Sequence, residues 1–144
     1  MDLPSSLRFE IVTPERAVVR EAVDEVQIPG GEGYFGVLPG HTPLLASLQV
    51  GELWFRQGDE RFYISVAFGF AEVLPDRVTV LAQIAERAEE IDVKRAEAAL
   101  ERARERVDRR AADIDFERAR IALLKSLMRL QVASKVRIRP SGRL

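Results

Sequence analysis

The hydrophobic period of this chain changes once, close to residues 85–92, and this change limits the fold more than any other feature. Before it, short runs rich in β-branched and aromatic residues alternate polar with apolar positions, as half-buried strands do. After it, apolar residues recur every three or four positions, which is the spacing of one helix face. The sequence therefore predicts two modules, residues 1–85 and residues 86–144.

The first module is predicted to be an antiparallel β-sandwich. Turn residues such as Pro29-Gly30-Gly31 and Pro75-Asp76 separate its apolar runs. Many short strands with no helical pattern between them are typical of a sandwich or a barrel. The expected strands are residues 7–12, 18–28, 52–55, 61–66, 70–74 and 78–81.

The second module is predicted to be an antiparallel two-helix hairpin. Asp92 is the expected N-cap of its first helix and Asp115 that of its second, with an interruption at residues 111–115 and a frayed tail from Pro140. The apolar seams are Val93, Ala96, Leu100, Ala103 and Val107 on the first helix, and Phe116, Ala119, Leu123, Leu127 and Leu130 on the second. Because alanine buries little area, we expect the hairpin to be either a marginal, two-state element or a modest coiled pair.

The inventory of reactive side chains argues against catalysis. The 144 residues include no cysteine, so disulfides and thiolate metal sites are excluded, and no nucleophile–base pair is recognised around the single histidine, His41. We predict no catalytic residue and no metal ligand, and we expect His41 to bond nearby backbone in a turn. No signal peptide is recognised, and no apolar stretch approaches the ~20 residues of a membrane span, which fits a reducing, non-secreted setting.

A glycine pattern at residues 31–36 spells G-x-G-x-x-G after a predicted strand. In dinucleotide-binding proteins such a pattern opens a helix, whose N-terminal amides meet the pyrophosphate. Here Pro39 and Pro43 follow instead, and they forbid that helix. The pattern therefore does not predict a dinucleotide site.

Charge is divided unevenly along the chain. Residues 1–85 carry six basic and twelve acidic side chains, a net −6, whereas residues 86–144 carry sixteen and eleven, a net +5. This asymmetry indicates an anionic partner or, alternatively, a solvated helix face. A nucleic-acid-binding module is a further alternative, but Phe116 is the sole aromatic residue of the second helix and lies on its seam, so no stacking platform is available. We therefore predict no nucleic acid among the partners.

The segment Gly33–Leu45 closely resembles the signature of the epsilon subunits of F-type ATP synthases, which has the core G-x-x-G-[IV]-[LY]-P-G-H-x-P. The likeness covers residues 7–133 in order, and the basic stretch after Lys135 has no counterpart in it. Further matches to the last sandwich strands and to the borders of the two helices are residues 69–73, 78–82, 85–92 and 113–116.

This resemblance implies a non-catalytic rotor subunit, peripheral on the cytoplasmic face of the bacterial cell membrane. It would bind the gamma subunit and the ring of c subunits, couple rotation and proton flow to ATP synthesis, and restrain ATP hydrolysis when its hairpin extends into the alpha/beta catalytic head. The implied gamma and c-ring contacts are Gly33, Tyr34, Phe35, Gly36, Pro39, Gly40 and His41. The implied head contacts are Arg118, Arg120, Lys125 and Arg129.

The resemblance also implies a regulatory ATP site on the folded hairpin, with no other cofactor. Residues 91–96 match the family motif [IL]-D-x-x-R-A, whose chemistry suits an adenine base and phosphates. Lys125 stands where some relatives have an arginine, and lysine lacks the bidentate guanidinium. The alternative is that Asp92 simply caps the helix and Arg95 is an ordinary exposed side chain. The implied site comprises Glu86, Ile91, Asp92, Arg95, Ala96, Arg102, Lys125 and Arg129.

Overall fold

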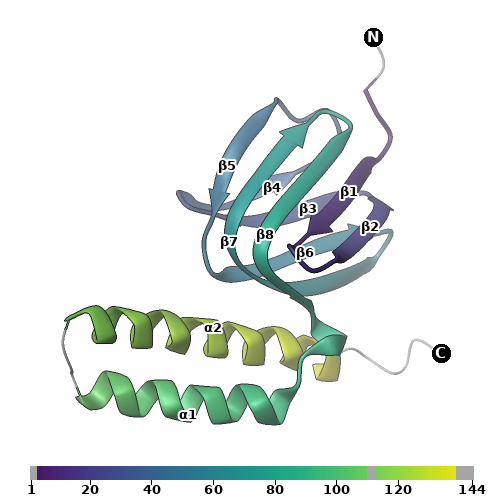
Figure 1. Ribbon diagram of the computed structural model, residues 1–144. Helices are drawn as coiled ribbons and strands as arrows, with labels where there is room; N and C mark the ends of the chain where they lie inside the picture. Colours follow the sequence, from purple (N-terminus) through teal and green to yellow (C-terminus); the bar gives the residue numbers. More distant parts are fainter. Residues whose placement is uncertain (1–2, 110–112, 139–144) are drawn as a thin grey trace. The chain divides into compact units, whose positions relative to one another are not determined.

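The computed structural model describes residues 3–109 and 113–138 (Figure 1). The chain divides into two compact units, Met1–Arg87 and Ala88–Leu144. The first unit is an all-β sandwich and the second is a pair of antiparallel helices, so the predicted fold class is confirmed.

Eight strands build the sandwich, in the sheet order β2-β1-β8-β7-β5-β3-β4, with β6 pairing with both β3 and β7. The pairing of β1 with β8 is parallel, and the other pairings are antiparallel. The strands are β1 Leu7–Val12, β2 Ala17–Val23, β3 Glu25–Gly30, β4 Gly33–Val37, β5 Leu44–Leu48, β6 Gly51–Gln57, β7 Glu60–Leu74 and β8 Arg77–Arg87.

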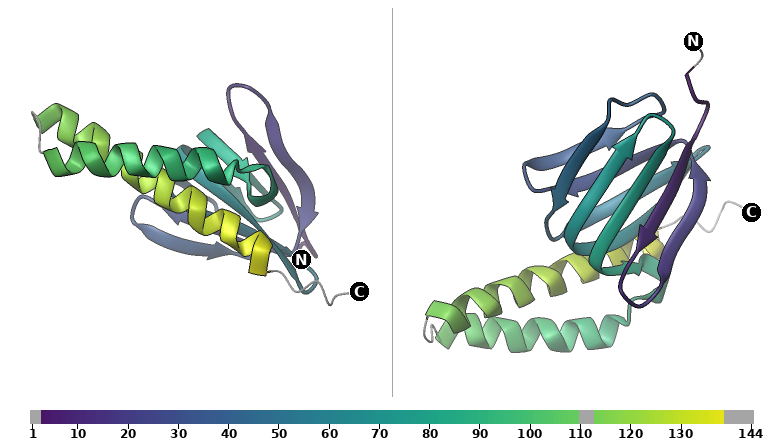
Figure 2. Two further views of the ribbon diagram at one scale, coloured as in Figure 1. Left: turned by 90° about the horizontal axis from the view of Figure 1, so that it is seen from below. Right: turned by 45° about the horizontal axis from the view of Figure 1, so that its top comes forward.

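The long strand β7 serves two neighbours in succession. Its first part pairs with β6, up to Val66 opposite Gly51, and its second part pairs with β5, from Gly69 opposite Leu48. Between these two parts the backbone takes positive φ angles, 61° at Phe68 and 126° at Gly69. The strand therefore bends where its partner changes, and β7 and β8 curve together through the sandwich (Figure 2).

Alternation along the strands fills the core. On β1, Leu7, Phe9 and Ile11 are buried, while Arg8 is exposed and Glu10 is half-buried. Phe55 joins the two sides of the core, with its ring centroid 5.5 Å from that of Phe9 and 5.1 Å from that of Phe62. Each fully buried aromatic or branched side chain contributes roughly 1.5–3 kcal/mol, which makes this core the main source of stability in the unit.

The predicted strand over residues 18–28 is wrong in one respect, because the structure divides it at Asp24. The amide of Asp24 donates to the Arg56 carbonyl at 2.8 Å, and its carboxylate accepts from the Gly58 amide at 2.7 Å. These two bonds hold a corner, so β2 pairs with β1 and β3 pairs with β4 and β6. Similarly, the two strands expected at 61–66 and 70–74 are one bent strand.

Strands β4 and β5 were not predicted, because glycine and proline dominate their neighbourhood. Pairing with β3 makes residues 33–37 a strand of a hairpin in spite of that composition. The glycine pattern at residues 31–36 is followed by β5 and not by a helix, as the two prolines predicted.

The second unit contains a short 3-10 helix, η1 (Ala88–Glu90), followed by α1 (Val93–Arg109) and α2 (Asp113–Ile138). The carboxylate of Asp92 accepts a hydrogen bond from the Arg95 amide at 3.1 Å, which confirms the predicted N-cap of α1. Helix α2 starts at Asp113, so Asp115 lies in its first turn and does not cap it. Part of the predicted interruption, residues 111–112, and the tail from Pro140 lie outside the described residues.

The bend of β7 generates a stability prediction. An added Cβ at Gly69 would lie 2.0 Å from the Leu81 carbonyl oxygen, so Gly69→Ala meets both a steric clash and an unfavourable φ. We expect the free energy of unfolding to fall by about 2–4 kcal/mol. Urea titration followed by the fluorescence of Trp54, which lies in the sandwich, measures the loss.

Gly58→Ala is the matched control for this substitution. Gly58 also has a positive φ, 62°, but a Cβ there meets nothing within 4 Å. The control should lose about 1–2 kcal/mol, the conformational cost alone. Equal losses in the two variants would show that close packing of the β7 bend against β8 is not important.

Candidate interaction surfaces

Three large apolar side chains stand exposed on neighbouring strands β5, β7 and β8. Leu45 is 71% exposed, Phe70 57% and Leu81 56%. Phe70 and Leu81 are directly opposite each other in the β7–β8 ladder, and Leu45 lies on β5, the other neighbour of this part of β7. We call these three residues the outer apolar face. Large exposed apolar side chains on neighbouring strands are a candidate contact surface for another molecule.

The outer apolar face was not predicted from the sequence, although a signal for it exists. Strict alternation places Ala71 and Val73 of β7 in the core, which requires Phe70 to point outward. An aromatic residue at an outward position of a strand is the feature that could have indicated the surface.

The glycine-rich segment that carries the family resemblance forms β4 and the turn that follows it. Tyr34 is 48% exposed, and its hydroxyl accepts a hydrogen bond from the Glu52 amide at 3.1 Å. A hollow of about 460 Å³ between β4 and β5 is lined by Tyr34, Phe35 and Leu45, among others. Since Leu45 also belongs to the outer apolar face, the two surfaces are continuous.

The turn after β4 is held by backbone bonds. The amide of Gly40 donates to the Pro75 carbonyl at 2.7 Å, and that of His41 donates to the Leu38 carbonyl at 3.1 Å. The His41 ring lies 2.6 Å from the Thr42 carbonyl through Nδ1, which must carry the proton because a carbonyl only accepts. This bond confirms the prediction of a turn histidine. The residues predicted to contact partners, from Gly33 to His41, thus lie on β4 and on a turn that backbone hydrogen bonds hold in place.

Small side chains form the buried seam of the hairpin. Ala96 and Ala103 of α1 are buried, as predicted, and their predicted neighbours Val93, Leu100 and Val107 are half-buried. On α2 the buried residues include Ala119, Ser126 and Ala133, each seven residues apart and therefore on one face. Alanine and serine allow two helices to approach closely.

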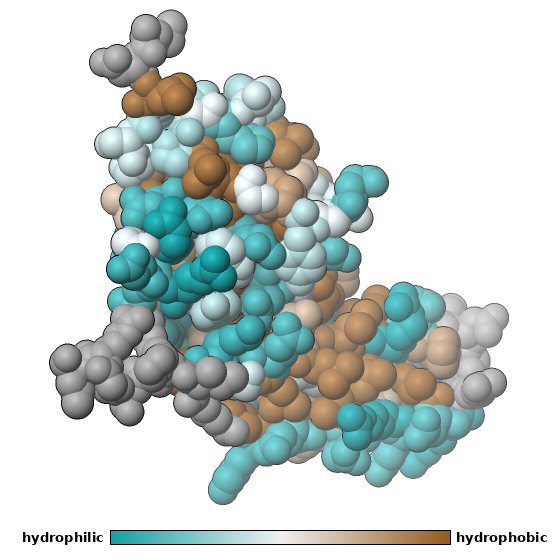
Figure 3. Space-filling model, turned by 180° about the vertical axis from the view of Figure 1, so that it is seen from behind, coloured by the Kyte–Doolittle hydropathy of each residue, from teal (hydrophilic) through white to brown (hydrophobic). Residues whose placement is uncertain are grey.

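The predicted seam of α2 is partly wrong. Ala119 is buried and Phe116, Leu123 and Leu130 are half-buried, but Leu127 is 41% exposed. Leu124, which lies outside the predicted seam, is 42% exposed. Helix α2 carries apolar residues around much of its circumference, so the period of 3.6 does not by itself select the face that meets α1. Hydrophobic side chains gather along the hairpin in Figure 3.

The residues of the implied ATP site occupy both units. Glu86 lies near the end of β8, and the remaining residues lie on the hairpin. Asp92 and Arg95 are exposed at the start of α1, and Ile91 and Ala96 beside them are buried. Farther along α1, Arg102 is exposed, whereas Lys125 and Arg129 of α2 are half-buried.

Helix α2 presents several basic residues with different surroundings. Arg120 donates to the carboxylate of Glu117 at 3.3 Å from Nε and 3.1 Å from Nη2, and this bonding raises the pKa of the guanidinium. Arg118 is exposed and takes part in no ion pair within the described residues. Of the predicted head contacts, Arg120 is thus already paired within its own helix. None of the helices in the described part of the chain is long and apolar enough to cross a membrane.

Comparison with known proteins gives matches in both units. Residues 6–88 match the family model "ATP synthase, Delta/Epsilon chain, beta-sandwich domain", and residues 89–134 match "ATP synthase, Delta/Epsilon chain, long alpha-helix domain". The chain is 57% identical over 101 residues to the ATP synthase epsilon chain of Solibacter usitatus, covering 70% of this chain and 75% of that protein. It is 50% identical over 133 residues to that of Syntrophobacter fumaroxidans, covering 92% and 99%.

A solved structure shares the fold. A chain of the mitochondrial ATP synthase of Euglena gracilis, determined as an OSCP/F1/c-ring assembly, superimposes with a TM-score of 0.79 at 23% identity. The match covers 96% of this chain and 85% of that one. At this identity the likeness supports the fold alone.

The small-residue seam generates a prediction about the hairpin. Ala103 is 2% exposed, so Ala103→Leu inserts three carbon atoms between closely packed helices. We expect the hairpin to lose about 1–3 kcal/mol of stability through overpacking. Hydrogen exchange of the α1 amides measures the change locally, without requiring the whole chain to unfold.

Ala98→Leu on the same helix is the matched control. Ala98 is exposed, so the same substitution should change stability by no more than about 0.5 kcal/mol. If Ala103→Leu protects the α1 amides as well as Ala98→Leu does, the seam is not closely packed.

Proposed function

The chain belongs to the ATP synthase delta/epsilon family, and from this premise we propose that it is a rotor subunit that couples rotation to ATP synthesis and restrains ATP hydrolysis. The observation that carries the proposal is the outer apolar face, which gives the sandwich a surface for permanent attachment. In this proposal the chain contributes no catalytic residue, and its role is accessory and regulatory.

The outer apolar face is proposed to dock on the gamma subunit. Phe70 and Leu81 expose more than half of their surface to water, and covering them stabilises a complex in proportion to the apolar area removed. The glycine-rich loop continues this surface through Leu45 and the hollow beside Tyr34. We assign the loop, from Gly33 to His41, to the remaining contacts with gamma and with the c-ring.

The hairpin is proposed to be the inhibitory element. It is a compact unit separate from the sandwich, so it can change partners while the sandwich stays attached. Its second helix exposes Leu124 and Leu127 together with basic residues, a combination that suits an acidic surface with apolar contacts. We assign Arg118, Arg120, Lys125 and Arg129 to contacts with the alpha/beta catalytic head. In this proposal Arg120 would contact the head while it remains hydrogen-bonded to Glu117.

ATP is proposed as a regulatory ligand of the hairpin. The Asp92 carboxylate accepts the Arg95 amide through one oxygen, and a carboxylate has further acceptor sites for the amine of an adenine base. None of the ion pairs within the described residues involves Arg95, so its guanidinium is available for a phosphate. Capping and ligand binding are therefore compatible at the same residue. As part of such a complex the subunit would lie at the cytoplasmic face of the bacterial membrane, bound through its partners.

The attachment of the sandwich is tested by replacing Phe70 and Leu81 with threonine. Both side chains point to solvent, so we expect little change in folding but at least about a tenfold loss in affinity for gamma. Ala22→Thr, at an exposed position of β2, is the control and should bind normally. Unchanged affinity in the double variant would remove the outer apolar face as the docking surface.

Reconstitution of the ATP synthase complex with a shortened chain tests the role of the hairpin. A chain that ends at Glu90 retains the sandwich and η1, so it should bind gamma and support ATP synthesis while losing its restraint of hydrolysis. ATP hydrolysis by the reconstituted complex measures this restraint. Full restraint by the shortened chain would show that the hairpin is not the inhibitory element.

The ATP site is tested by calorimetry on the full chain. Arg95→Ala removes a charge-assisted contact, and we expect ATP affinity to fall by about 1.5–3 kcal/mol. Asp92→Ser should preserve the helix cap and lower the affinity for ATP, so this variant separates the capping role of the residue from its binding role. Arg104→Ala, on the same helix and ion-paired with Glu101, should bind ATP normally. Absence of binding at millimolar ATP in the unaltered chain would disprove the site.

A further inference from the structure

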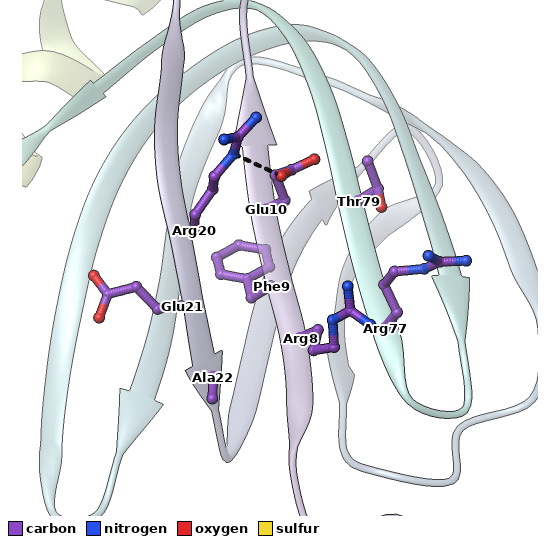
Figure 4. Close-up of a pocket in the computed structure, with 8 residues that line it drawn as sticks. All are labelled: Arg8, Phe9, Glu10, Arg20, Glu21, Ala22, Arg77 and Thr79. Atoms are coloured by element: carbon purple, nitrogen blue, oxygen red, sulfur yellow. Dashed lines mark hydrogen bonds and ion pairs between the residues drawn. The ribbon is translucent and has the colours of Figure 1, made fainter.

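Three of the seven basic residues of the sandwich unit gather in one hollow on its surface. Residues 1–87 carry seven basic and thirteen acidic side chains, so a cationic cluster is unexpected there. Arg8 of β1, Arg20 of β2 and Arg77 of β8 nevertheless line a hollow of about 410 Å³, with Thr79 at its wall (Figure 4).

The strand pairing places two of these arginines next to each other. Arg8 and Arg77 are register partners in the parallel β1–β8 pair, on strands that lie about 4.8 Å apart. The Arg8 amide donates to the carbonyl of Asp76 at 3.0 Å, which fixes β1 against the turn that precedes Arg77. Thr79 follows two residues later on β8 and therefore shares the face of Arg77.

The two acidic residues that line the hollow, Glu10 and Glu21, are already engaged. The Glu10 carboxylate accepts from Arg20 at 2.8 Å. The Glu21 carboxylate accepts from Arg87 at 3.1 Å and from the side-chain amide of Gln57 at 2.9 Å. Within the described residues neither Arg8 nor Arg77 takes part in an ion pair. Like charges at directly opposite positions of neighbouring strands are unfavourable unless something neutralises them.

We infer that Arg8, Arg77 and Thr79 form a binding site for a phosphoryl group on the outer face of the β1–β8 pair. Two guanidinium forks supply several N–H donors and two positive charges, and the Thr79 hydroxyl adds a further donor. A single carboxylate carries one charge and is satisfied by one such fork. The paired forks therefore suit a doubly charged, tetrahedral oxyanion better than an acidic side chain.

The site lies within the sandwich and uses none of the residues assigned to gamma, to the catalytic head or to ATP. It is therefore independent of the proposed function. Its ligand is defined by chemistry, and a soluble phosphate compound and a phospholipid headgroup both present the same group. The two sources can be distinguished experimentally by supplying the phosphoryl group either in a soluble compound or in a lipid vesicle.

Calorimetry of the full chain with inorganic pyrophosphate tests the soluble source, and flotation with phosphatidylcholine vesicles containing phosphatidic acid tests the lipid source. We expect Arg8→Gln combined with Arg77→Gln to weaken binding by at least about tenfold, because each fork contributes charge-assisted bonds. Arg8→Lys with Arg77→Lys keeps the charge but loses the forks, so its binding should be intermediate.

Arg104→Gln with Arg106→Gln on α1 changes the net charge equally and is the control, which should bind like the unaltered chain. Loss of pyrophosphate binding only in the Arg8/Arg77 variants supports a soluble ligand, and loss of vesicle binding only in those variants supports a lipid ligand. The inference is overturned if neither probe binds the unaltered chain, or if the glutamine variant and the control bind equally. Circular dichroism confirms that each variant is folded.

Discussion

The close passage of Gly69 past the carbonyl of Leu81 is the contact on which the sandwich depends. It lets β7 bend after pairing with β6 and continue as the partner of β5, so that one strand serves two neighbours. The same bend sets the alternation beyond it, which buries Ala71 and Val73 and turns Phe70 outward beside Leu81. Core closure and the outer apolar face therefore have one structural cause.

The hairpin is stabilised in a different way from the sandwich. Its seam gains stability from the close approach of small side chains, and the area buried by each alanine is slight. Because α2 keeps leucines outside this seam, the helix has apolar surface left for a second partner. A pair of helices with little buried area per seam residue and with spare apolar and basic surface fits the proposed exchange of partners, whereas the outer apolar face of the sandwich fits the proposed fixed attachment.

The predictions from sequence succeeded where local physics decides the outcome. The change of period near residues 85–92, the cap at Asp92 and the turn at His41 are local features, and the structure contains the two helices, the cap and the turn bond. Strands β4 and β5 were missed because the glycines of β4 and the prolines between the two strands favour turns locally, while pairing with β3 and β7 overrides that preference.

Periodicity, capping and composition act over a few neighbouring residues, so the two kinds of architecture, the order of most elements and the absence of cysteine chemistry can be read from the sequence. The tertiary structure alone decided which face of α2 is buried, that Leu45, Phe70 and Leu81 share a surface, and that Arg8 meets Arg77. Arg8 and Arg77 are far apart in sequence, so their juxtaposition arises from the parallel pairing of β1 with β8. Alternation along each strand shows which face is buried, but it does not show which distant strand will be its partner.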